Sequence, residues 1–306
     1  MVQRIVSFLP SATELLYELG AQDMLYGVTH ECLYPEDAKT KSRIINSVFD
    51  PQKMSSQEID KTTCTLLKEG KDIFALDEKN LIDANPDLII SQNTCEVCAA
   101  HTNQVSRACE IIKTKPELYS MDPHNVNEIL DSVIELSKMI GKEQEGKKLR
   151  ESLEKRIQKI KEKKVSNKPN VLALEWVDPL FTSGHWVPEM IEIAGGVNLV
   201  SKIGEHSRRM TLDEAIKSEP DVIILMPCGF DTERARSEYL ESLAKNESWR
   251  NLKTVKENKV YAVDANSFFN KPSIRTITGI EILAKILHPE IFDDVLVPGN
   301  SYKVIG

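Results

Sequence analysis

The sequence of 306 residues has no long hydrophobic run, and no stretch approaches the ~20 apolar residues that a membrane-spanning helix needs. The segment that begins Met1-Val2-Gln3-Arg4 also lacks the charged region, long apolar region and small-residue cleavage site of a secretory signal. We therefore expect no membrane span, and a cytoplasmic protein if this is the whole gene product. A trimmed export signal would instead make the protein extracytoplasmic.

The chain also lacks a basic face. Its formal net charge is −8, with 39 Lys and Arg against 47 Asp and Glu, and the only dense basic run lies around residues 147–164. Nucleic acids and anionic membranes bind concentrated positive surfaces. The charge therefore argues against nucleic acid as the main partner and favours a small-molecule ligand or a protein partner.

No nucleophile elbow, P-loop or dinucleotide-binding fingerprint is present. Serine, histidine and acidic residues are available, but no familiar catalytic spacing connects them. We therefore expect a binding protein rather than an enzyme.

Two stretches of the sequence echo each other. Residues 80–90 and 213–224 each have the pattern of a short helix, a Pro-Asp turn and a buried strand. Two similar, Rossmann-like α/β lobes are the simplest explanation. The expected organisation is an N-terminal α/β lobe over residues 1–123, a linking helical segment over 124–166, and a C-terminal α/β lobe with a short tail over 167–306.

The linking segment predicts two helices, over residues 126–140 and from 143 to about 165. In the second helix, apolar residues recur every three or four positions and make one stripe on an otherwise charged helix. The stripe consists of Leu149, Leu153, Ile157 and Ile160. Such a helix either packs on the surface of one lobe or serves as a stiff strut that joins both lobes, and the two roles are compatible.

The N-terminal segment predicts a strand over residues 4–9, followed by a helix that stops at Gly20. Ser11 and Glu14 have the spacing of a capping box, in which each side chain bonds the other residue's backbone N–H. We therefore expect Ser11 to be the N-cap of this helix.

Four of the six cysteines follow apolar runs that are typical of buried strands. In open α/β sheets, ligands bind outside the carboxyl ends of the strands, so these thiols are candidates for one site. They are Cys32, Cys95, Cys98 and Cys228. Four thiolates in a tetrahedral array suit zinc or an iron–sulfur cluster. The alternative is that Cys95 and Cys98 lie in a loop and that Cys32 and Cys228 are buried small residues.

Aromatic residues make up only 6% of the sequence, yet several follow the expected strands of the second lobe. Broad apolar walls with a few polar contacts suit a large planar ligand. The candidate wall residues are Trp176, Trp186, Phe230 and Phe268. Phe269 is the more typical core residue, whereas Trp186 is expected in a loop before a helix.

Polar candidates accompany these aromatics. His185 lies beside Trp186, and His30 and Glu31 precede Cys32; imidazole is the commonest metal ligand among side chains. Arg275 is a candidate for binding anionic or amide groups of a ligand. Arg208 and Arg209 could do the same, although adjacent arginines are often simply solvated.

Several phrases form an ordered set that is more specific than any one of them. The first lobe has Arg4-Ile5-Val6-Ser7-Phe8-Leu9-Pro10-Ser11-Ala12-Thr13-Glu14, Gly27-Val28 before Tyr34-Pro35, and Pro86-Asp87-Leu88-Ile89. The second has Asp178-Pro179-Leu180-Phe181-Thr182-Ser183-Gly184, Glu192-Ile193-Ala194-Gly195-Gly196-Val197-Asn198, and Phe268-Phe269 with Arg275. Through these phrases, residues 3–288 resemble the class III substrate-binding proteins of ABC importers, in particular the cobalamin-binding and iron-complex-binding branch.

The resemblance implies two lobes bridged by a single long helix, a ligand cleft between them and limited hinge motion. It also implies a cobalamin-like corrinoid or a related metal chelate as ligand, for which a histidine could be the axial ligand. A function in an ABC importer implies a permease partner, on which the family docks with one acidic residue from each lobe. Asp213 matches one docking position, but Lys79, next to Glu78, occupies the other.

A second hypothesis comes from the cysteines. It describes an intracellular metalloprotein on the same scaffold, with zinc or an iron–sulfur cluster held by the four thiols in a redox or enzymatic role. The lack of a recognised export signal and the rarity of unpaired cysteine clusters in exported proteins favour it.

Overall fold

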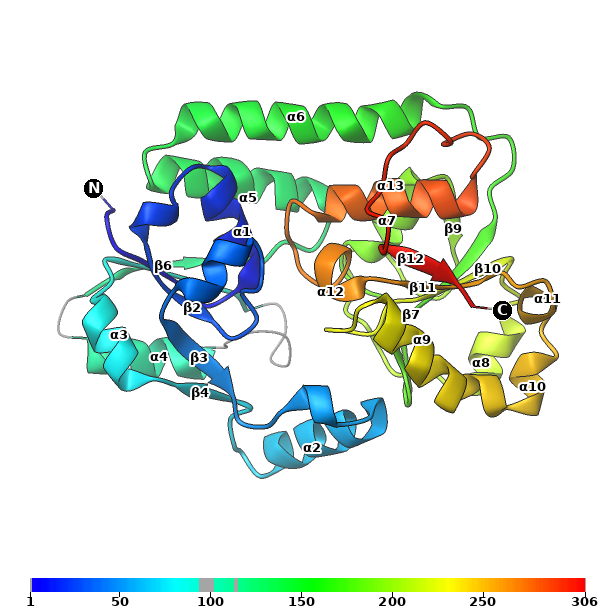
Figure 1. Cartoon of the computed structure of the whole chain (residues 1–306), viewed down its shortest axis with the longest axis horizontal. Coiled ribbons are helices and arrows are strands. Elements are labelled where there is room, and N and C mark those ends of the chain that lie inside the picture. The colour runs from blue at the N-terminus through cyan, green and yellow to red at the C-terminus, as the bar shows by residue number, and fades with distance from the viewer. Residues whose placement is uncertain (1, 94–101, 113–114, 306) are drawn as a thin grey trace. The chain divides into compact units, whose positions relative to one another are not determined.

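The computed structural model describes residues 2–93, 102–112 and 115–305, which form two compact α/β units. The first unit comprises Met1–Met54, Glu58–Pro123 and Asn127–Ser152, and the second comprises Ser55–Gln57, His124–Val126 and Leu153–Gly306. Each unit has its own sheet with helices packed around it (Figure 1). The expected two-lobed α/β fold is confirmed.

The sheet of the first unit has the strand order β4-β3-β2-β1-β5-β6, and all its neighbours are parallel except β3 and β4. Its strands are β1 (Ile5–Ser7), β2 (Leu25–Thr29), β3 (Arg43–Ser47), β4 (Phe74–Leu76), β5 (Leu88–Ser91) and β6 (Glu117–Ser120). The helices of this part of the chain are α1 (Pro10–Glu18), α2 (Ser56–Lys68), α3 (Glu78–Ala84), α4 (Thr102–Ile111) and α5 (Val126–Met139). The central strands β1 and β5 are fully buried, as expected of parallel strands covered on both faces.

The sheet of the second unit has the order β12-β11-β10-β7-β8, with β9 paired to β7. Its strands are β7 (Asn170–Val177), β8 (Leu180–Thr182), β9 (Val197–Asn198), β10 (Val222–Leu225), β11 (Val260–Val263) and β12 (Tyr302–Val304). Its helices are α7 (Val187–Ile193), α8 (Leu212–Lys217), α9 (Thr232–Glu241), α10 (Glu247–Arg250), α11 (Lys253–Lys256), α12 (Ala265–Phe268) and α13 (Thr276–Leu287). The strands β7, β10 and β11 are parallel, so their carboxyl ends lie at the same edge of this sheet.

The helix α6 (Glu143–Glu162) is one uninterrupted helix, and the boundary between the two units falls within it, at Ser152 (Figure 1). Of the expected apolar stripe, Leu153, Ile157 and Ile160 are buried and Leu149 is half-buried. Arg156 adds a two-point ion pair with Glu281 of α13, at 2.6 and 2.8 Å. The carboxyl half of α6 is therefore fixed to the second unit by both apolar and charged contacts.

The sequence echo corresponds to a repeated structural device. Asn85, the C-cap of α3, and Glu219, which follows the C-cap of α8, both have positive φ (41° and 45°) and precede a Pro-Asp turn. The carboxylate of Asp87 then accepts the backbone N–H groups of Gln3 and Arg4 (2.9 and 3.0 Å), and that of Asp221 accepts the N–H of Asn170 (2.8 Å). In each unit, the turn before one strand thus caps the start of its neighbour.

The expected capping box at Ser11 and Glu14 is wrong. The helix α1 begins at Pro10, its N-cap is Leu9, and no side chain caps it. Proline is well suited to the first helical position, because its φ is preset and it has no N–H to satisfy there. Ser11 and Glu14 are instead buried within the helix.

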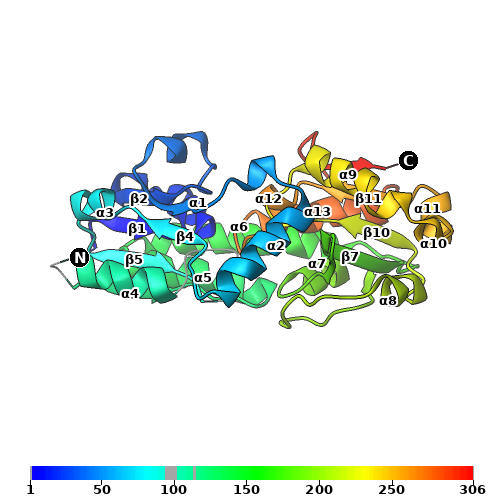
Figure 2. The same cartoon turned by 90° about the horizontal axis from the view of Figure 1, so that it is seen from below.

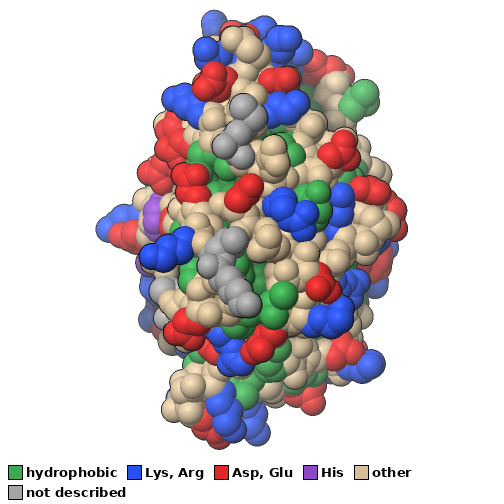
Figure 3. Space-filling model, turned by 90° about the vertical axis from the view of Figure 1, so that its left-hand side faces the viewer, with side chains coloured by type: hydrophobic (Ala, Val, Ile, Leu, Met, Phe, Trp, Pro, Cys, Tyr) green, Lys and Arg blue, Asp and Glu red, His purple; other side chains and the backbone are tan. Residues whose placement is uncertain are grey.

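Acidic and basic side chains are interspersed on the face of the molecule shown in Figure 3. Figure 2 shows the helices and strands of each unit from a second direction. Within the residues that the structure describes, no helix is both long enough and apolar enough to span a bilayer.

The repeated Asp side chains give a first prediction. Asp87→Ala should lower the free energy of unfolding by about 1–2 kcal/mol, because two backbone N–H groups at the start of β1 lose their charged acceptor. Urea unfolding followed by circular dichroism measures this loss. Asp23→Ala, at an exposed position of the short 3-10 helix Gln22–Met24, is the control, and equal midpoints for both variants would show that Asp87 does not stabilise the strand.

Candidate functional site

Trp176 lies near the carboxyl end of β7 and is half-buried. In the pairing of β7 with β8 it is opposite Phe181, and its ring centroid lies 5.3 Å from that of Phe230. Its indole N–H donates to the carbonyl oxygen of Ser56 (3.2 Å), which belongs to the second unit. Trp176 and Phe230 therefore form an aromatic pair at the edge of the sheet where ligands bind in open α/β folds.

Phe230 and Phe268 follow β10 and β11, the next two strands of this sheet. The carbonyl oxygen of Phe230 accepts the N–H of Asn266 (3.1 Å), so the segment after β10 is bonded to the first turn of α12, which carries Phe268. The guanidinium carbon of Arg275 lies 4.8 Å from the ring centroid of Phe268. The structure thus brings four sequence-predicted candidates, Trp176, Phe230, Phe268 and Arg275, to one edge.

Trp186 is buried, as are Phe230 and Phe268, which are 2% and 8% exposed. It directly precedes α7, its side chain is only 5% exposed, and its indole N–H donates to the carbonyl oxygen of Phe269 (2.8 Å). The sequence favoured Phe269 over Trp186 as a core residue, but both are buried. A role of Trp186 in ligand binding stays a prediction.

His185 lies in a cluster of three imidazole rings. Its ring centroid is 4.9 Å from that of His206 and 5.8 Å from that of His124. His185 has a φ of 54°, a left-handed conformation that costs a residue with a Cβ about 1–2 kcal/mol. Two backbone bonds hold it there: its N–H donates to Glu205 (2.6 Å) and its carbonyl accepts from Gly204 (2.9 Å).

The surroundings of His185 disfavour its charged form. Burial, and then the positive charges of His206 and His124, lower the pKa of His185 to about 4. Its Nδ1 atom is buried and has no hydrogen-bond partner among the described residues. His185 is therefore held neutral at physiological pH.

Glu175 is a buried acidic residue that the sequence did not predict for this region. It precedes Trp176 in β7, is only 8% exposed, and bonds the side chain of Ser207. Burial raises the pKa of Glu175 to about 7, and the bond with Ser207 offsets only part of this effect. One sequence signal was available, since Glu175 is the only charged residue in the apolar run 171–177.

Arg234 was missed as well. Its guanidinium carbon lies 3.7 Å from the ring centroid of Phe230, on the first turn of α9. Burial lowers the pKa of Arg234, while Glu238 and Asp231 act in the opposite direction. The four-residue spacing of Phe230 and Arg234 at a helix start was the only sequence signal for this contact.

His30 and Glu31 lie in the first unit, in the turn after β2, and both are half-buried. The backbone N–H of His30 donates to Ile45 (2.9 Å), and its ring centroid lies 5.9 Å from that of Phe74. The N–H of Glu31 donates to the Thr29 hydroxyl (3.1 Å). These contacts fix the turn, and a role in ligand binding stays a prediction for both residues.

Of the four candidate metal ligands, Cys95 and Cys98 lie outside the described residues. The Cys32 sulfur is buried in the first unit, 3.1 Å from the hydroxyl of Thr13 and 3.4 Å from that of Thr29. Cys228, in the second unit, is half-buried, and its N–H donates to Glu175 (3.2 Å). Within residues 2–93, 102–112 and 115–305, no group of three or more His, Cys, Asp or Glu could hold a metal ion. The environment of Cys32 is that of a buried small residue.

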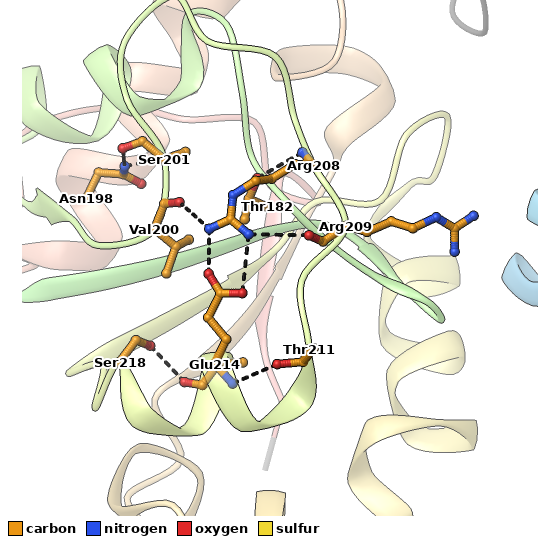
Figure 4. Close-up of polar contacts among 10 residues, drawn as sticks. Thr182, Asn198, Val200, Ser201, Arg208, Arg209, Thr211, Glu214 and Ser218 are labelled. Atoms are coloured by element: carbon orange, nitrogen blue, oxygen red, sulfur yellow. Dashed lines mark hydrogen bonds and ion pairs between the residues drawn. The ribbon is translucent and has the colours of Figure 1, made fainter.

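The side chain of Arg208 bonds other residues of the second unit. Its guanidinium makes a two-point contact with the carboxylate of Glu214 and also donates to the carbonyl oxygens of Val200 and Arg209 (Figure 4). The side chain of Arg209 extends away from this cluster (Figure 4).

The raised pKa of Glu175 gives a prediction for stability against pH. Because the folded protein binds this proton more tightly than the unfolded chain, the stabilisation is complete below pH 4.5 and is lost as pH rises through about 7. Glu175→Gln removes this loss and keeps a partner for Ser207. Relative to the wild type, the free energy of unfolding of the variant should rise by up to about 3 kcal/mol when the pH rises from 4.5 to 8. Urea unfolding at both pH values is the measurement, and a difference independent of pH would contradict the assignment.

The lowered pKa of His185 predicts the opposite dependence of stability on pH. Here the unfolded chain binds the proton more tightly, so the stabilisation is complete above pH 6.5 and is lost as pH falls through about 4. Asparagine tolerates a positive φ, so His185→Asn should keep the backbone conformation. Relative to the wild type, the Tm of this variant should rise by several degrees when the pH falls from 8 to 5. The contribution of Glu175 cancels in this comparison. His288→Asn is the control, and equal changes in both variants would refute the prediction.

Comparisons with known proteins agree with this architecture. The family described as periplasmic binding protein matches residues 5–267. The vitamin B12-binding protein of Vibrio cholerae serotype O1 is 23% identical over 286 residues, covering 91% of this chain and 87% of that protein. YvrC of Bacillus subtilis, described as an uncharacterized ABC transporter substrate-binding lipoprotein, is 23% identical over 304 residues, covering 95% and 82%.

Among solved structures, Staphylococcus aureus IsdE complexed with heme superposes with a TM-score of 0.69. It covers 93% of this chain and 98% of IsdE, at 17% sequence identity, and so supports the fold alone. The family match spans most of the sequence and confirms the resemblance drawn from its phrases. The chain belongs to the periplasmic binding protein family.

Proposed function

We propose that this protein is the substrate-binding component of an ABC importer, and that its ligand is a cobalamin-like corrinoid or a related metal chelate. The observation that carries the proposal is the aromatic edge of the second sheet, where Trp176 lies near the carboxyl end of β7, and Phe230 and Phe268 follow the neighbouring strands β10 and β11. The names of the relatives support it, because one is a vitamin B12-binding protein and another structure holds heme.

The aromatic edge suits a large planar ligand on physical grounds. A ring system of this size buries a wide apolar surface, and flat side chains offer contact area at a low cost in conformational entropy. Polar groups at the rim of such a wall then fix the orientation of the ligand. That the ligand lies in a cleft between the two units stays a prediction of the sequence resemblance.

Membership in this family favours the extracytoplasmic alternative for location, and nothing in the relatives supports the cytoplasmic expectation. The intracellular metalloprotein likewise gains no support from them. We therefore propose an exported or lipid-anchored protein that collects its ligand outside the cytoplasm.

A permease is the partner that this function requires, and the two candidate docking helices differ in charge. In α8, Asp213 pairs with Lys217 (2.6 Å); in α3, Lys79 pairs with Asp83 (2.8 Å), so the order of the charges is reversed. All four side chains are well exposed. Asp213 fits the docking residue that the resemblance implies, whereas Lys79 requires an acidic or neutral group on the permease.

Titration of the purified protein with cyanocobalamin and with hemin tests the proposed function. A bound ring changes its own absorption spectrum and quenches nearby tryptophan, so both signals should saturate at one ligand per chain for at least one probe. Absence of saturable binding for both probes would refute the proposal.

Removal of the aromatic edge should weaken the complex. Trp176→Ala and Phe268→Ala should each raise Kd by about tenfold, because each loses stacking and apolar contact worth 1–2 kcal/mol. Tyr26→Ala, an exposed aromatic at the amino end of β2, should leave Kd unchanged. Thermal unfolding of each variant confirms that it is folded, and an unaltered Kd in both edge variants would remove the aromatic edge from the site.

A further inference from the structure

The indole N–H of Trp176, near the carboxyl end of β7, donates to the carbonyl oxygen of Ser56 (3.2 Å). Ser56 is the first residue of α2 and is only 1% exposed. It lies in the stretch Ser55–Gln57, which is part of the second unit, although the residues on both sides of this stretch belong to the first unit. The indole is therefore bonded to a short segment that lies 120 residues earlier in the chain.

The carboxylate of Glu238, in α9, fixes this segment. One of its oxygens, Oε2, accepts both the backbone N–H of Ser56 (3.2 Å) and the Ser56 hydroxyl group (2.8 Å). The first N–H groups of a helix have no partner within the helix, and a negative charge is favourable at this end. Glu238 therefore supplies a charged acceptor for the first turn of α2.

The backbone around Glu238 is fixed as well. The carbonyl oxygen of Glu238 accepts the N–H (3.0 Å) and the hydroxyl (2.6 Å) of Ser242, the C-cap of α9. The next residue, Tyr239, is buried, and its hydroxyl accepts the indole N–H of Trp249 (3.2 Å). A well-anchored helix end thus supports the carboxylate that holds Ser56.

These bonds determine what Trp176 offers to a ligand. Its only hydrogen-bond donor on the side chain, the indole N–H, already has an acceptor in the protein, so the ring contributes flat apolar surface. The ring also contacts that of Phe230, with 5.3 Å between the centroids and 56° between the planes. Because both contacts restrict the indole before a ligand arrives, less entropy is lost on binding.

We propose that Glu238 is a positioning residue for ligand binding, which acts through Ser56 to fix the indole of Trp176 in the orientation that contacts the ligand. This inference rests on the proposed function, since it assumes that Trp176 touches the ligand.

Glu238 also interacts electrostatically with Arg234, one turn earlier in α9. A substitution of Glu238 alone would therefore mix two effects. Ser56→Ala separates them, because it removes one bond to the carboxylate and leaves the charge of Glu238 in place.

Acrylamide quenching of tryptophan fluorescence tests the positioning without a ligand. The other two tryptophans of the chain are only 5% and 0% exposed, so quenching reports mainly on Trp176. Glu238→Ala should free the indole and increase the quenching, and Ser56→Ala should do so to a smaller extent. Glu238→Gln keeps an acceptor oxygen and should stay close to the wild type. Glu241→Ala, at an exposed position of the same helix, is the matched control and should change nothing.

Titration with cyanocobalamin and with hemin measures the effect on binding. For each probe that binds the wild type, Glu238→Ala should raise Kd about two- to tenfold, because the ligand must then order the indole itself. Trp176→Phe keeps a ring but has no N–H, so adding Glu238→Ala to it should change Kd by less than about 1.5-fold. Both substitutions break the same connection, and their effects should therefore not add.

The outcomes separate this inference from the proposed function. Additive effects of Glu238→Ala and Trp176→Phe on Kd, or wild-type quenching in Glu238→Ala, would overturn the positioning role while ligand binding itself stands. If the wild type binds neither probe, the proposed function fails and the inference fails with it. Should Glu238→Ala not fold, the quenching of Ser56→Ala and the same cycle of Ser56→Ala with Trp176→Phe decide instead.

Discussion

Parallel pairing of β7, β10 and β11 is the constraint on which the candidate site depends. The register joins residues 171–174 to 222–225 and residues 223–225 to 260–262, segments separated by more than 30 residues of sequence. Because the three strands point the same way, the segments that leave them must emerge at one edge. Aromatic side chains from three distant regions meet there without any local sequence signal that connects them.

Buried polar groups of the second unit lower the stability of the fold. Burial raises the pKa of Glu175 to about 7. His185 has both a strained backbone and a buried ring nitrogen. Their contributions to stability change with pH in opposite directions, so acidification weakens one while it strengthens the other. Neither group improves packing. Buried polarity and strain of this kind are concentrated at functional sites in folded proteins, and the core strands offset their cost.

The fold was largely predictable because its strongest signals are local. The two Pro-Asp turns and their apolar strands gave the two units, and the spacing of Leu153, Ile157 and Ile160 gave α6. The capping box failed because Ser11 and Glu14 have the right spacing for a cap that Pro10 makes unnecessary. The spacing of Ser11 and Glu14 alone therefore placed the N-cap two residues after the observed one, Leu9.

The candidate site was predictable only in part, and the missing part is informative. The aromatic residues could be found because each follows an apolar strand, but the partner of each ring depends on how chain segments meet in space. Arg209 reaches Phe181 across the hairpin edge, and Arg234 reaches Phe230 from the next helix. Sequence alone also cannot distinguish Arg208 from Arg209, because only the fold brings Glu214 to one and an aromatic ring to the other. The partner of each cation is therefore a property of the tertiary structure, because the fold brings different groups to arginines that are neighbours in the sequence.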